Sequence, residues 1–558
     1  MKIFNVNLIS KGKKSYFFLL TLVGLLVGLM GCSSSSQPES KQILRLNIAH
    51  EPHSLDPRRG RDYIGSAMHY LLFEGLLRLS NDASLMPAQA QKIDISEDGL
   101  IYTFHLRDAV WSDGTAVTAQ DFEHSWKTLL SPDFPTPSAH LFYPIKNAKK
   151  AKLGEVTVSE IGIVSENAKT LVVTLEKPTP YFLKLVAYCA FFPVKHTLDQ
   201  ASGEWMNQTS SQFISNGPFA LKTWKHHKKI NLDKNEHYWD ASSIHLDGLK
   251  ISMISDENTA LNLYENGDLD ILGAGLSPIS SDAASYYHKK GLLHTVAAPA
   301  TTVITFNTTK YPFNNINIRK AFSYAINRQQ ITQNVTQLNE IAATGIIPPA
   351  FMPNRRSSCF QDHDTQKAKY HLSLGLKELG ISLKDFPKVM LNYTFSELNR
   401  KLAQVLQDQW MHTLGIQIDL HNLEHQVHIE NLTTLSYDLA QSFWVAQYSD
   451  PMSILERFNS KNNYKNYTGW ENKEYTDLLE ESSQVMPSDQ RVELLQEAES
   501  LIMEEMPIAP VYHWQFSFLA KDYVHFPPLL PNGAFDYSRI HMEKREESLL
   551  SKETLPRH

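Results

Sequence analysis

The chain has 558 residues, several times the length of a typical domain, so we expect more than one hydrophobic core, arranged in two or three lobes. Its composition is that of a globular protein, with 42% hydrophobic and 20% charged residues, and the net charge is −7. Basic clusters are short and scattered, which excludes the extended basic surface that binding to nucleic acid requires.

The N-terminus has the features of an export signal that ends at a lipidated cysteine. Lys11, Lys13 and Lys14 precede an apolar run over residues 16–30, and Gly31 and Cys32 follow this run directly. The run is shorter than the roughly 20 apolar residues that a membrane-spanning helix requires. We therefore predict a lipoprotein signal peptide over residues 1–31, a lipid on Cys32 and a polar tether over residues 32–42. The alternative is a short N-terminal membrane anchor, and either arrangement leaves the bulk of the chain outside the cytoplasm.

Besides Cys32, the chain contains Cys189 and Cys359. One pair of cysteines in a chain of this size is not the disulfide framework that stabilises small secreted domains. Cys189 lies in the apolar segment Val186–Phe192, where a cysteine usually packs as a small hydrophobic residue. We expect core packing for Cys189 and keep a bridge to Cys359 as the alternative.

Alternation between apolar and polar residues predicts half-buried strands in several parts of the chain. The alternating apolar residues are Leu44, Leu46 and Ile48; Tyr102, Phe104 and Leu106; Leu171, Val173 and Leu175; and Ile416, Ile418 and Leu420. Helical spacing predicts helices between these strands. Their apolar faces contain Ile318, Ala321, Phe322, Ala325 and Ile326, and Leu494, Leu495, Ala498, Leu501 and Ile502. Ser488 is positioned to cap the second helix, which we expect to end before Pro507.

The order of these elements indicates a mixed α/β fold. The strands are separated irregularly, unlike the strict alternation of a barrel or the fixed period of a solenoid. The last segment, residues 543–558, is charged and nearly free of aromatic residues. We expect this tail to be disordered.

Longer segments carry a resemblance to a known family. Residues Ile101–Trp126 resemble a block near the start of the oligopeptide- and dipeptide-binding lipoproteins of bacterial ABC importers, extracellular solute-binding proteins of family 5. Further matches occur in the same order along the chain, at residues 50–57, 73–77, 216–219, 238–240, 266–270, 313–327 and 491–512. The resemblance therefore extends collinearly from about residue 43 to about residue 540.

The resemblance implies a two-lobed periplasmic-binding-protein-like fold with an additional domain and a hinge that the chain crosses twice. On the family plan, lobe I comprises residues 43–85 and 200–300, and the accessory domain comprises residues 86–199. Lobe II comprises residues 301–515, and residues 516–542 return to lobe I.

The resemblance also implies a function. Such a protein captures oligopeptides by closing its lobes and delivers them to the permease and ATPase subunits of an ABC importer, without catalysis and without a cofactor. We expect a monomer in the bacterial cell envelope that is anchored through Cys32 and faces the periplasm or the exterior. A sensor or adhesin that binds peptide but serves no transporter is the alternative.

A receptor for peptides of many sequences has to recognise the backbone and the charged ends that all peptides share. Adding the ligand as a short strand achieves this, while hydrated pockets accept varied side chains. The resemblance assigns this role to two segments. They correspond to Glu51, Pro52 and His53, and to Phe443, Trp444, Val445 and Ala446. Pro52 has no N–H group to donate.

Two positions depart from the family pattern. The aspartate that holds the ligand ammonium in oligopeptide receptors corresponds to Gln447, and an arginine that can meet the ligand carboxylate corresponds to Gln441. An amide keeps a hydrogen bond but loses its charge-assisted part. Asp450 could take over the ammonium, or it could simply cap the turn before Pro451. A ligand with a modified end, such as a cell-wall peptide, is the other alternative.

Aromatic side chains are expected around the ligand because they combine apolar area with a polar edge. The candidates are Trp444, Tyr448, Tyr512 and Trp514. For Tyr512 and Trp514, core packing in a buried strand over residues 508–516 is the alternative. For Trp444 we expect replacement by alanine to weaken binding while the lobes remain folded. Residues 392–401 could add a loop at the mouth of the cleft.

One histidine motif suggests a different class of protein. His421, Glu424 and His425 match the H-x-x-E-H pattern of certain zinc enzymes, and His428 follows three residues later. Zinc binding by this pattern requires both histidines within a helix, whereas we expect His421 in the turn between a strand and a helix. We also expect residues 226–227, two histidines between lysines, to form an exposed hairpin turn. Uptake of metal or heme complexes remains an alternative, and we predict no resident metal.

Overall fold

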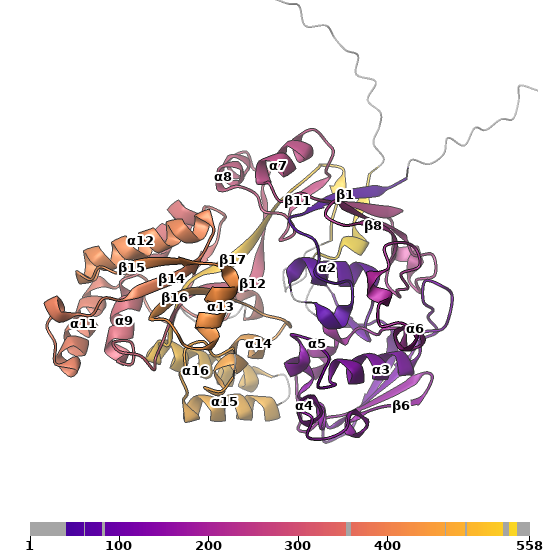
Figure 1. Cartoon of the computed structure of the whole chain (residues 1–558), viewed down its shortest axis with the longest axis horizontal. Coiled ribbons are helices and arrows are strands. Elements are labelled where there is room, and N and C mark those ends of the chain that lie inside the picture. The colour runs from indigo at the N-terminus through magenta and orange to yellow at the C-terminus, as the bar shows by residue number, and fades with distance from the viewer. Residues whose placement is uncertain are drawn as a thin grey trace, which may run out of the picture. The chain divides into compact units, whose positions relative to one another are not determined.

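The computed structural model describes residues 41–60, 62–80, 84–352, 359–463, 465–485, 488–527 and 535–543 (Figure 1). The predicted signal peptide, Cys32 and most of the tether lie outside the described residues, as does the charged tail beyond residue 543. The described residues from Gln42 onward form one compact unit. Within these residues, no helix combines the length and the apolar character needed to cross a bilayer.

The first sheet contains the predicted strand at the start of the folded part. Its strand order is β1 (Ile43–Ile48), β10 (Gly248–Met253), β9 (Lys229–Lys234) and β8 (Phe219–Lys225). Strand β1 is parallel to β10, and the other neighbours are antiparallel. Leu44, Leu46 and Ile48 are buried as the alternation predicts. Helix α2 (Tyr63–Leu72) packs beside β8 (Figure 1).

A second, antiparallel sheet lies in the part of the chain predicted as the accessory domain. Its order is β4 (Ala90–Ile95), β5 (Ile101–Leu106), β7 (Thr170–Thr174) and β6 (Ile163–Asn167). The helices around it are α3 (Ala119–Leu129), α4 (Ala148–Lys152), α5 (Phe182–Val186) and α6 (His196–Ala201). Thr118 and Asp121 form a capping box at the start of α3, and this helix packs on β6 and β7.

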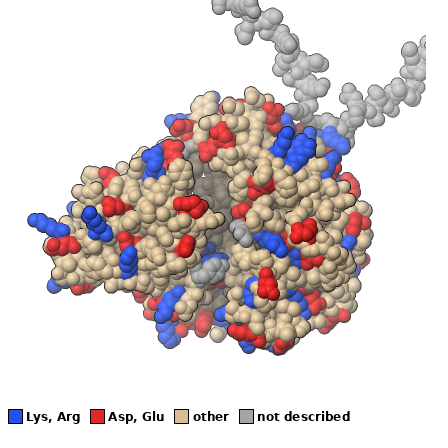
Figure 2. Space-filling model, in the orientation of Figure 1, with Lys and Arg blue, Asp and Glu red and all other residues tan. Residues whose placement is uncertain are grey.

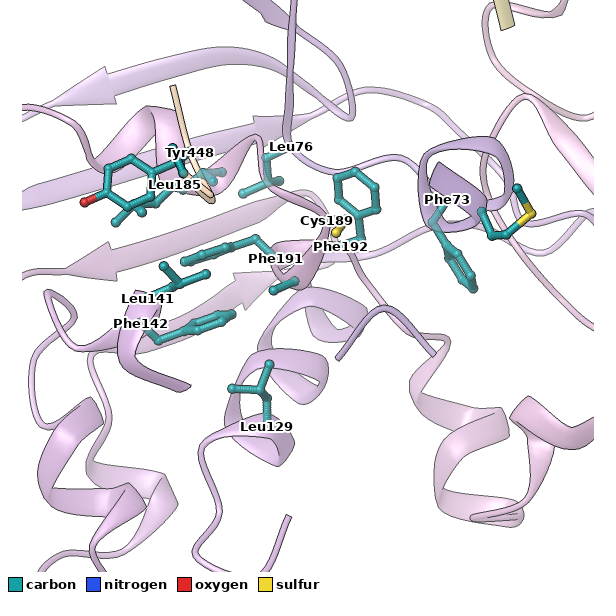
Figure 3. Packing of buried hydrophobic residues seen from close by; sticks show 14 of the residues in the cluster. Phe73, Leu76, Leu129, Leu141, Phe142, Leu185, Cys189, Phe191, Phe192 and Tyr448 are labelled. Carbon is teal, nitrogen blue, oxygen red and sulfur yellow. The ribbon is translucent and has the colours of Figure 1, made fainter. Parts of the chain in front are cut away.

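The core next to this sheet is rich in aromatic side chains. Phe142 and Phe191 stack with ring centroids 3.8 Å apart, and Cys189 lies among these aromatic residues together with Phe192 (Figure 3). Cys189 is buried, and neither it nor Cys359 forms a disulfide bond. The predicted core packing of Cys189 is therefore confirmed, and the alternative bridge between the two cysteines is wrong.

The largest sheet connects distant parts of the chain. Its order is β11 (Ile271–Gly273), β17 (Ile508–Ala520), β12 (His294–Phe306), β16 (Leu439–Val445), β14 (Met390–Thr394) and β15 (Asp419–Leu423), with β13 (Ile341–Ala342) paired to β17. Strands β12 and β17 are antiparallel over their whole length, from the pair His294 and Phe518 to the pair Thr305 and Ile508. Both long strands are paired with β11 or its neighbour at one end and with β16 or its neighbour at the other. The chain therefore runs twice between these two parts of the sheet, once in β12 and once in β17.

Helices cover this sheet. Those described are α9 (Ile316–Tyr324), α10 (Arg328–Ile331), α11 (Thr365–Leu379), α12 (Glu397–Leu414), α13 (His425–Thr433), α14 (Met452–Leu455), α15 (Lys473–Gln484) and α16 (Asp489–Glu505). The predicted apolar face around Ile318 and Phe322 is buried on α9. Helix α16 is capped by Ser488 and ends at Glu505, before Pro507, as predicted.

Shorter elements complete the described fold. They are β2 (Leu77–Leu79), β3 (Leu85–Pro87), α7 (Glu257–Glu265), α8 (Ser281–Lys289), β18 (Val524–His525) and β19 (His541–Met542). Strands β2 and β3 form a small antiparallel pair, and β18 pairs with β19 in the same way.

The strand predicted over residues 416–420 is displaced. Strand β15 begins at Asp419 and ends at Leu423. Helix α12 ends at Leu414, and Gly415 follows in the left-handed conformation at φ 71°. Residues 416–418 therefore form the connection between α12 and β15. Ile416 and Ile418 are buried, and their alternation reflects packing against the core, since the pairing with β14 starts only at Asp419.

Candidate functional site

The backbone of β16 is open along one edge. On one side β16 pairs with β12 over its whole length, whereas on the other side the pairing with β14 includes only Leu439 and Ala440. Strand β14 ends at Thr394, and the chain continues into α12. Residues 441–445 of β16 therefore have no neighbouring strand on the β14 side among the described residues.

The hydrogen bonds of β16 define which residues face this open edge. The N–H of Ala446 donates to the carbonyl of Pro299. The backbone N–H and C=O groups of the even-numbered residues of β16 therefore point toward β12. The backbone N–H and C=O groups of the odd-numbered residues point toward the open edge, because these groups alternate in direction along a strand. Two of the carbonyls on that edge are bound by side chains, since His428 Nε2 lies 2.9 Å from the carbonyl of Gln441 and Arg457 donates to the carbonyl of Val445 at 3.0 Å. Between them lies the backbone of Phe443.

Side chains of the predicted binding segment point to two sides of the sheet. Phe443 and Val445 are 51% and 36% exposed, whereas Trp444 is fully buried. The Trp444 ring packs on Phe458 with centroids 4.7 Å apart, and Arg457 lies over it at 5.5 Å. The structure places the Trp444 side chain in the core, because the period of two that exposes its neighbours turns it inward, and a role of Trp444 in ligand binding stays a prediction.

Of the other aromatic candidates, only Trp514 is partly exposed, and it lies beside Phe443. Its ring lies 5.1 Å from that of Phe443, and its Nε1 donates to Thr302 Oγ1 at 2.7 Å. Tyr512 lies opposite Thr302 in the same sheet but is buried, and Trp514 packs against the core that contains it. Tyr448 is also buried, and it stacks on Tyr181 with centroids 5.4 Å apart.

The predicted loop over residues 392–401 lies next to this edge. Gln441 is buried, and its Nε2 donates to Oδ1 of Asn399 at 2.9 Å, which ties the strand to the first turn of α12. The amide oxygen of Gln441 is buried and accepts no hydrogen bond from the described residues. Phe395, in the same loop, is 85% exposed. This arrangement offers an apolar surface and one acceptor beside the open edge.

The second predicted segment is held by the first sheet. The Glu51 carboxylate accepts hydrogen bonds from Trp224 Nε1 at 2.7 Å and from His226 at 2.8 Å, and it pairs with His227 at 3.0 Å. Glu51 thus fastens its segment to the hairpin between β8 and β9, while the side chain of His53 is exposed. The two histidines form the predicted hairpin turn, but they contact Glu51 as well as solvent.

A buried ion pair fixes the chain just beyond this segment. Arg58 is 1% exposed and forms hydrogen bonds of 2.8 to 3.2 Å with the carboxylates of Asp56 and Asp199. His124 also contacts Asp199, at 2.7 Å. Asp199 and His124 belong to the predicted accessory domain, so this network attaches that domain to the start of lobe I.

Asp450 has protein partners of its own. Its carboxylate lies 2.8 and 3.0 Å from the guanidinium of Arg491 and 3.0 Å from Nζ of Lys184. Burial opposes its charge, but Lys184 and Arg491 outweigh burial and hold the pKa of Asp450 below its usual value. The carboxylate is therefore already neutralised, which argues against Asp450 as the partner of a ligand ammonium.

Gln447 contacts two basic side chains. Its Oε1 lies 2.9 Å from Lys465 Nζ and 2.8 Å from His140 Nε2, and these two nitrogen atoms are 2.9 Å apart. Burial and the neighbouring Arg457 lower the pKa of Lys465 to about 7, and burial together with Lys465 lowers the pKa of His140 to about 3. Sequence reasoning missed Lys465 and His140 because they meet Gln447 only in the folded chain.

The histidine motif does not form a metal site. His421 lies in β15, and Glu424 caps α13 by accepting from the N–H of Gln426 at 2.8 Å. The prediction that His421 precedes the helix is confirmed, although it lies in the strand and not in the turn. His428 is bound to the carbonyl of Gln441. The described part of the chain contains no group of three histidine, cysteine or acidic residues that could hold a metal ion.

A space-filling view shows where this edge lies on the molecule. Figure 2 shows a hollow between the surface over α13 and the surface over α2. Helix α13 supplies His428 to the edge of β16, and α2 follows the segment that Glu51 fastens to the first sheet. The helices next to the two segments predicted to bind a ligand thus lie on the two sides of this hollow.

Comparison with known proteins identifies the family. The model of the bacterial extracellular solute-binding proteins, family 5, matches residues 84–466. The chain belongs to this family. The family 5 resemblance predicted from the sequence is therefore confirmed, and the members of this family are extracellular solute-binding proteins.

Individual relatives cover almost the whole chain. The oligopeptide-binding protein OppA of Bacillus subtilis is 36% identical over 89% of this chain and 92% of its own length. The dipeptide-binding protein DppE of the same organism is 33% identical, with 92% and 96% covered. The structure of the murein tripeptide-binding protein MppA of Escherichia coli superposes with a TM-score of 0.77 at 30% identity, covering 90% of this chain and 99% of MppA. The mixed α/β fold of the two-lobed binding proteins is confirmed.

Proposed function

We propose that this family 5 protein binds oligopeptides, or peptide-like solutes, and delivers them to the permease of an ABC importer. The relatives described above are named for binding oligopeptides, dipeptides and a murein tripeptide. The observation in this chain that carries the proposal is the open edge of β16 between Gln441 and Val445.

An extended peptide satisfies such an edge by adding one strand to the sheet. The N–H and C=O of Phe443 point along this edge, and they have no partner among the described residues. A ligand backbone can pair with both groups, and this pairing is independent of the ligand sequence. His428 and Arg457 already bind the carbonyls of Gln441 and Val445, so the strand added by the ligand is short.

The side chains around Phe443 suit varied ligand residues. Phe443, Val445 and Trp514 offer an apolar surface that is only partly covered by the protein. The neighbouring loop adds the exposed ring of Phe395. Apolar surface without a set of convergent polar groups favours hydrophobic side chains but does not select one sequence.

Contacts between the predicted accessory domain and lobe II support ligand capture by closure. Lys184 binds Asp450, and Tyr181 stacks on Tyr448. Each contact joins a residue of the segment 86–199 to a residue that follows β16. A ligand that touches both sides stabilises the arrangement in which these contacts form, and closure is then a shift of population toward that arrangement.

The remaining parts of the proposal rest on the sequence. We propose that Cys32 carries the lipid that anchors the protein in the bacterial cell envelope, that the protein acts as a monomer, and that it catalyses no reaction. Labelling of growing cells with radioactive palmitate tests the anchor. The wild-type protein should incorporate label, and the Cys32→Ala variant should not. Incorporation by both proteins would contradict lipidation at this residue.

Two substitutions at one position test the open edge. Phe443→Pro removes both the ring and the N–H, whereas Phe443→Ala removes only the ring and serves as the matched control. Within the described part of the chain the N–H faces no neighbouring strand, so proline is compatible with this edge position. We expect the proline variant to bind a pool of tripeptides at least tenfold more weakly than the alanine variant, with similar circular dichroism. Equal affinities of the two variants would contradict strand addition at Phe443.

A further inference from the structure

The end of β16 leads into a cluster of basic side chains. Gln447 and Lys465 follow β16 in the chain, and His140 comes from the short helix Ala139–Phe142 of the predicted accessory domain. The Lys465 ammonium donates to Oε1 of Gln447 at 2.9 Å and lies 2.9 Å from Nε2 of His140. All three side chains are only partly buried, so a ligand that runs along the edge of β16 can reach them.

The surroundings of this cluster are cationic. Arg457 approaches the same strand, and its guanidinium donates to the carbonyl of Val445. Lys465, His140 and Arg457 line one cavity of about 830 Å³ together with Tyr448 and Glu456. Glu456 is an acid in the same cavity, and burial raises its pKa to about 7. Because the pKa of Lys465 is also about 7, each of these two side chains carries less than a full charge near neutral pH, and Arg457 leaves the cavity cationic.

Other charged groups near the cluster offset one another. Asp450 is bound by Arg491 and by Lys184. The cavity is also lined by two lysines and two glutamates, Lys149, Lys177, Glu176 and Glu480. These four charges cancel, and the charged group next to Gln447 is the Lys465 side chain, 2.9 Å from its amide oxygen.

A free peptide amine and the Lys465 side chain carry the same charged group. An ammonium at Gln447 would lie within a few ångströms of the Lys465 ammonium, in a partly buried place where screening by water is weak. A carboxylate oxygen, or the carbonyl oxygen of an acylated amine, would instead accept hydrogen bonds from a cationic donor, and such bonds are roughly twice as strong as neutral ones.

We propose that the ligand end that reaches Gln447 presents an acceptor oxygen and no positive charge. This inference rests on the proposed peptide binding and narrows its substrate class to peptides with an acylated amine at this position, or to peptides that direct their carboxylate to it. Lys465 is the specificity-determining residue, and Gln447 holds its ammonium in place.

Terminal modification of one ligand set tests this inference. The probe is an equimolar pool of Ala-X-Ala tripeptides, prepared with free ends, with acetylated amines, with amidated carboxylates and with both changes. Affinities are measured by native mass spectrometry on the purified protein. If an acylated amine is bound, acetylation should raise the affinity at least tenfold. If the carboxylate is bound, amidation should lower it at least tenfold, and acetylation should have no effect.

Substitutions of Lys465 test whether this residue determines the preference for one terminal group of the ligand. Lys465→Gln should remove whichever terminal preference the wild-type protein has, and Lys465→Arg should retain it because the charge is kept. Lys461→Gln is the matched control, because Lys461 is 62% exposed and pairs with Glu471. Thermal unfolding of each variant establishes that it is folded.

The outcomes separate this inference from the proposed function. Tighter binding of peptides with free amines than of acetylated peptides would overturn the inference while leaving peptide binding intact. The same holds if no terminal change alters the affinity, or if Lys465→Gln keeps the wild-type preference. Absence of binding for all four pools would overturn the proposed function, and with it this inference.

Discussion

Replacing Asp450 by asparagine should lower the free energy of unfolding by about 3 kcal/mol. The Asp450 carboxylate is 1% exposed, and it meets the 7% exposed side chain of Arg491 in two hydrogen bonds of 2.8 and 3.0 Å. Removing one partner of a buried ion pair typically costs 3–5 kcal/mol, because the other charge remains buried without compensation. Asparagine keeps the side-chain volume and one acceptor oxygen, which places the expected loss at the lower end.

Lys184→Met is the comparison for this variant. The Lys184 side chain is 31% exposed, and its loss leaves Asp450 paired with Arg491. Exposed ion pairs contribute about 0–1 kcal/mol, so we expect less than about 1 kcal/mol of destabilisation. Urea unfolding followed by circular dichroism measures both variants under the same conditions. An Asp450→Asn protein as stable as the wild type, or no more destabilised than Lys184→Met, would refute the assignment of Asp450 to a buried structural pair.

Three further predictions follow from burial and charge. Trp444→Ala should destabilise the protein by about 3–5 kcal/mol, because the ring is buried against Phe458; unchanged urea unfolding would contradict this packing. Burial lowers the pKa of His69 to about 4, so the unfolded chain binds a proton between about pH 6.5 and 4 that the folded chain does not. Stability should therefore fall across this range by on the order of 3 kcal/mol, and His69→Gln should remove that part of the slope in pH-dependent unfolding. The pKa of Lys465 is lowered to about 7 in the free protein, and a ligand with an acceptor oxygen favours the protonated form. Affinity for that ligand should consequently fall as the pH rises above about 7, whereas Lys465→Arg should show a flat profile.

Local patterns predicted those parts of the fold in which burial follows the strand or helix period. The strand at Leu44–Ile48 and the helix capped by Ser488 are examples, because their apolar residues face a single core. The boundary of β15 was displaced because Ile416 and Ile418 alternate without pairing. Alternation of apolar and polar residues indicates that one face of a segment is buried. It indicates strand pairing only where a neighbouring strand is present.

The sequence predicted which segment forms the candidate site, but it predicted only some of the side chains that lie there. The resemblance predicted a binding role for the segment from Phe443 to Ala446, and the same period of two could have assigned the Trp444 side chain to the core. No local signal marks Lys465, because it reaches Gln447 from 18 residues further along the chain. The open edge of β16 likewise depends on where β14 ends, which is a property of the sheet and not of the β16 sequence.

The most direct test of peptide binding is to identify what the purified protein carries. Native mass spectrometry gives the mass of the bound species, and denaturation followed by sequencing identifies what is released. Binding through the backbone edge of β16 predicts a series of masses from short peptides of mixed sequence. A single non-peptide mass, or a bound metal complex in place of peptides, would contradict the account.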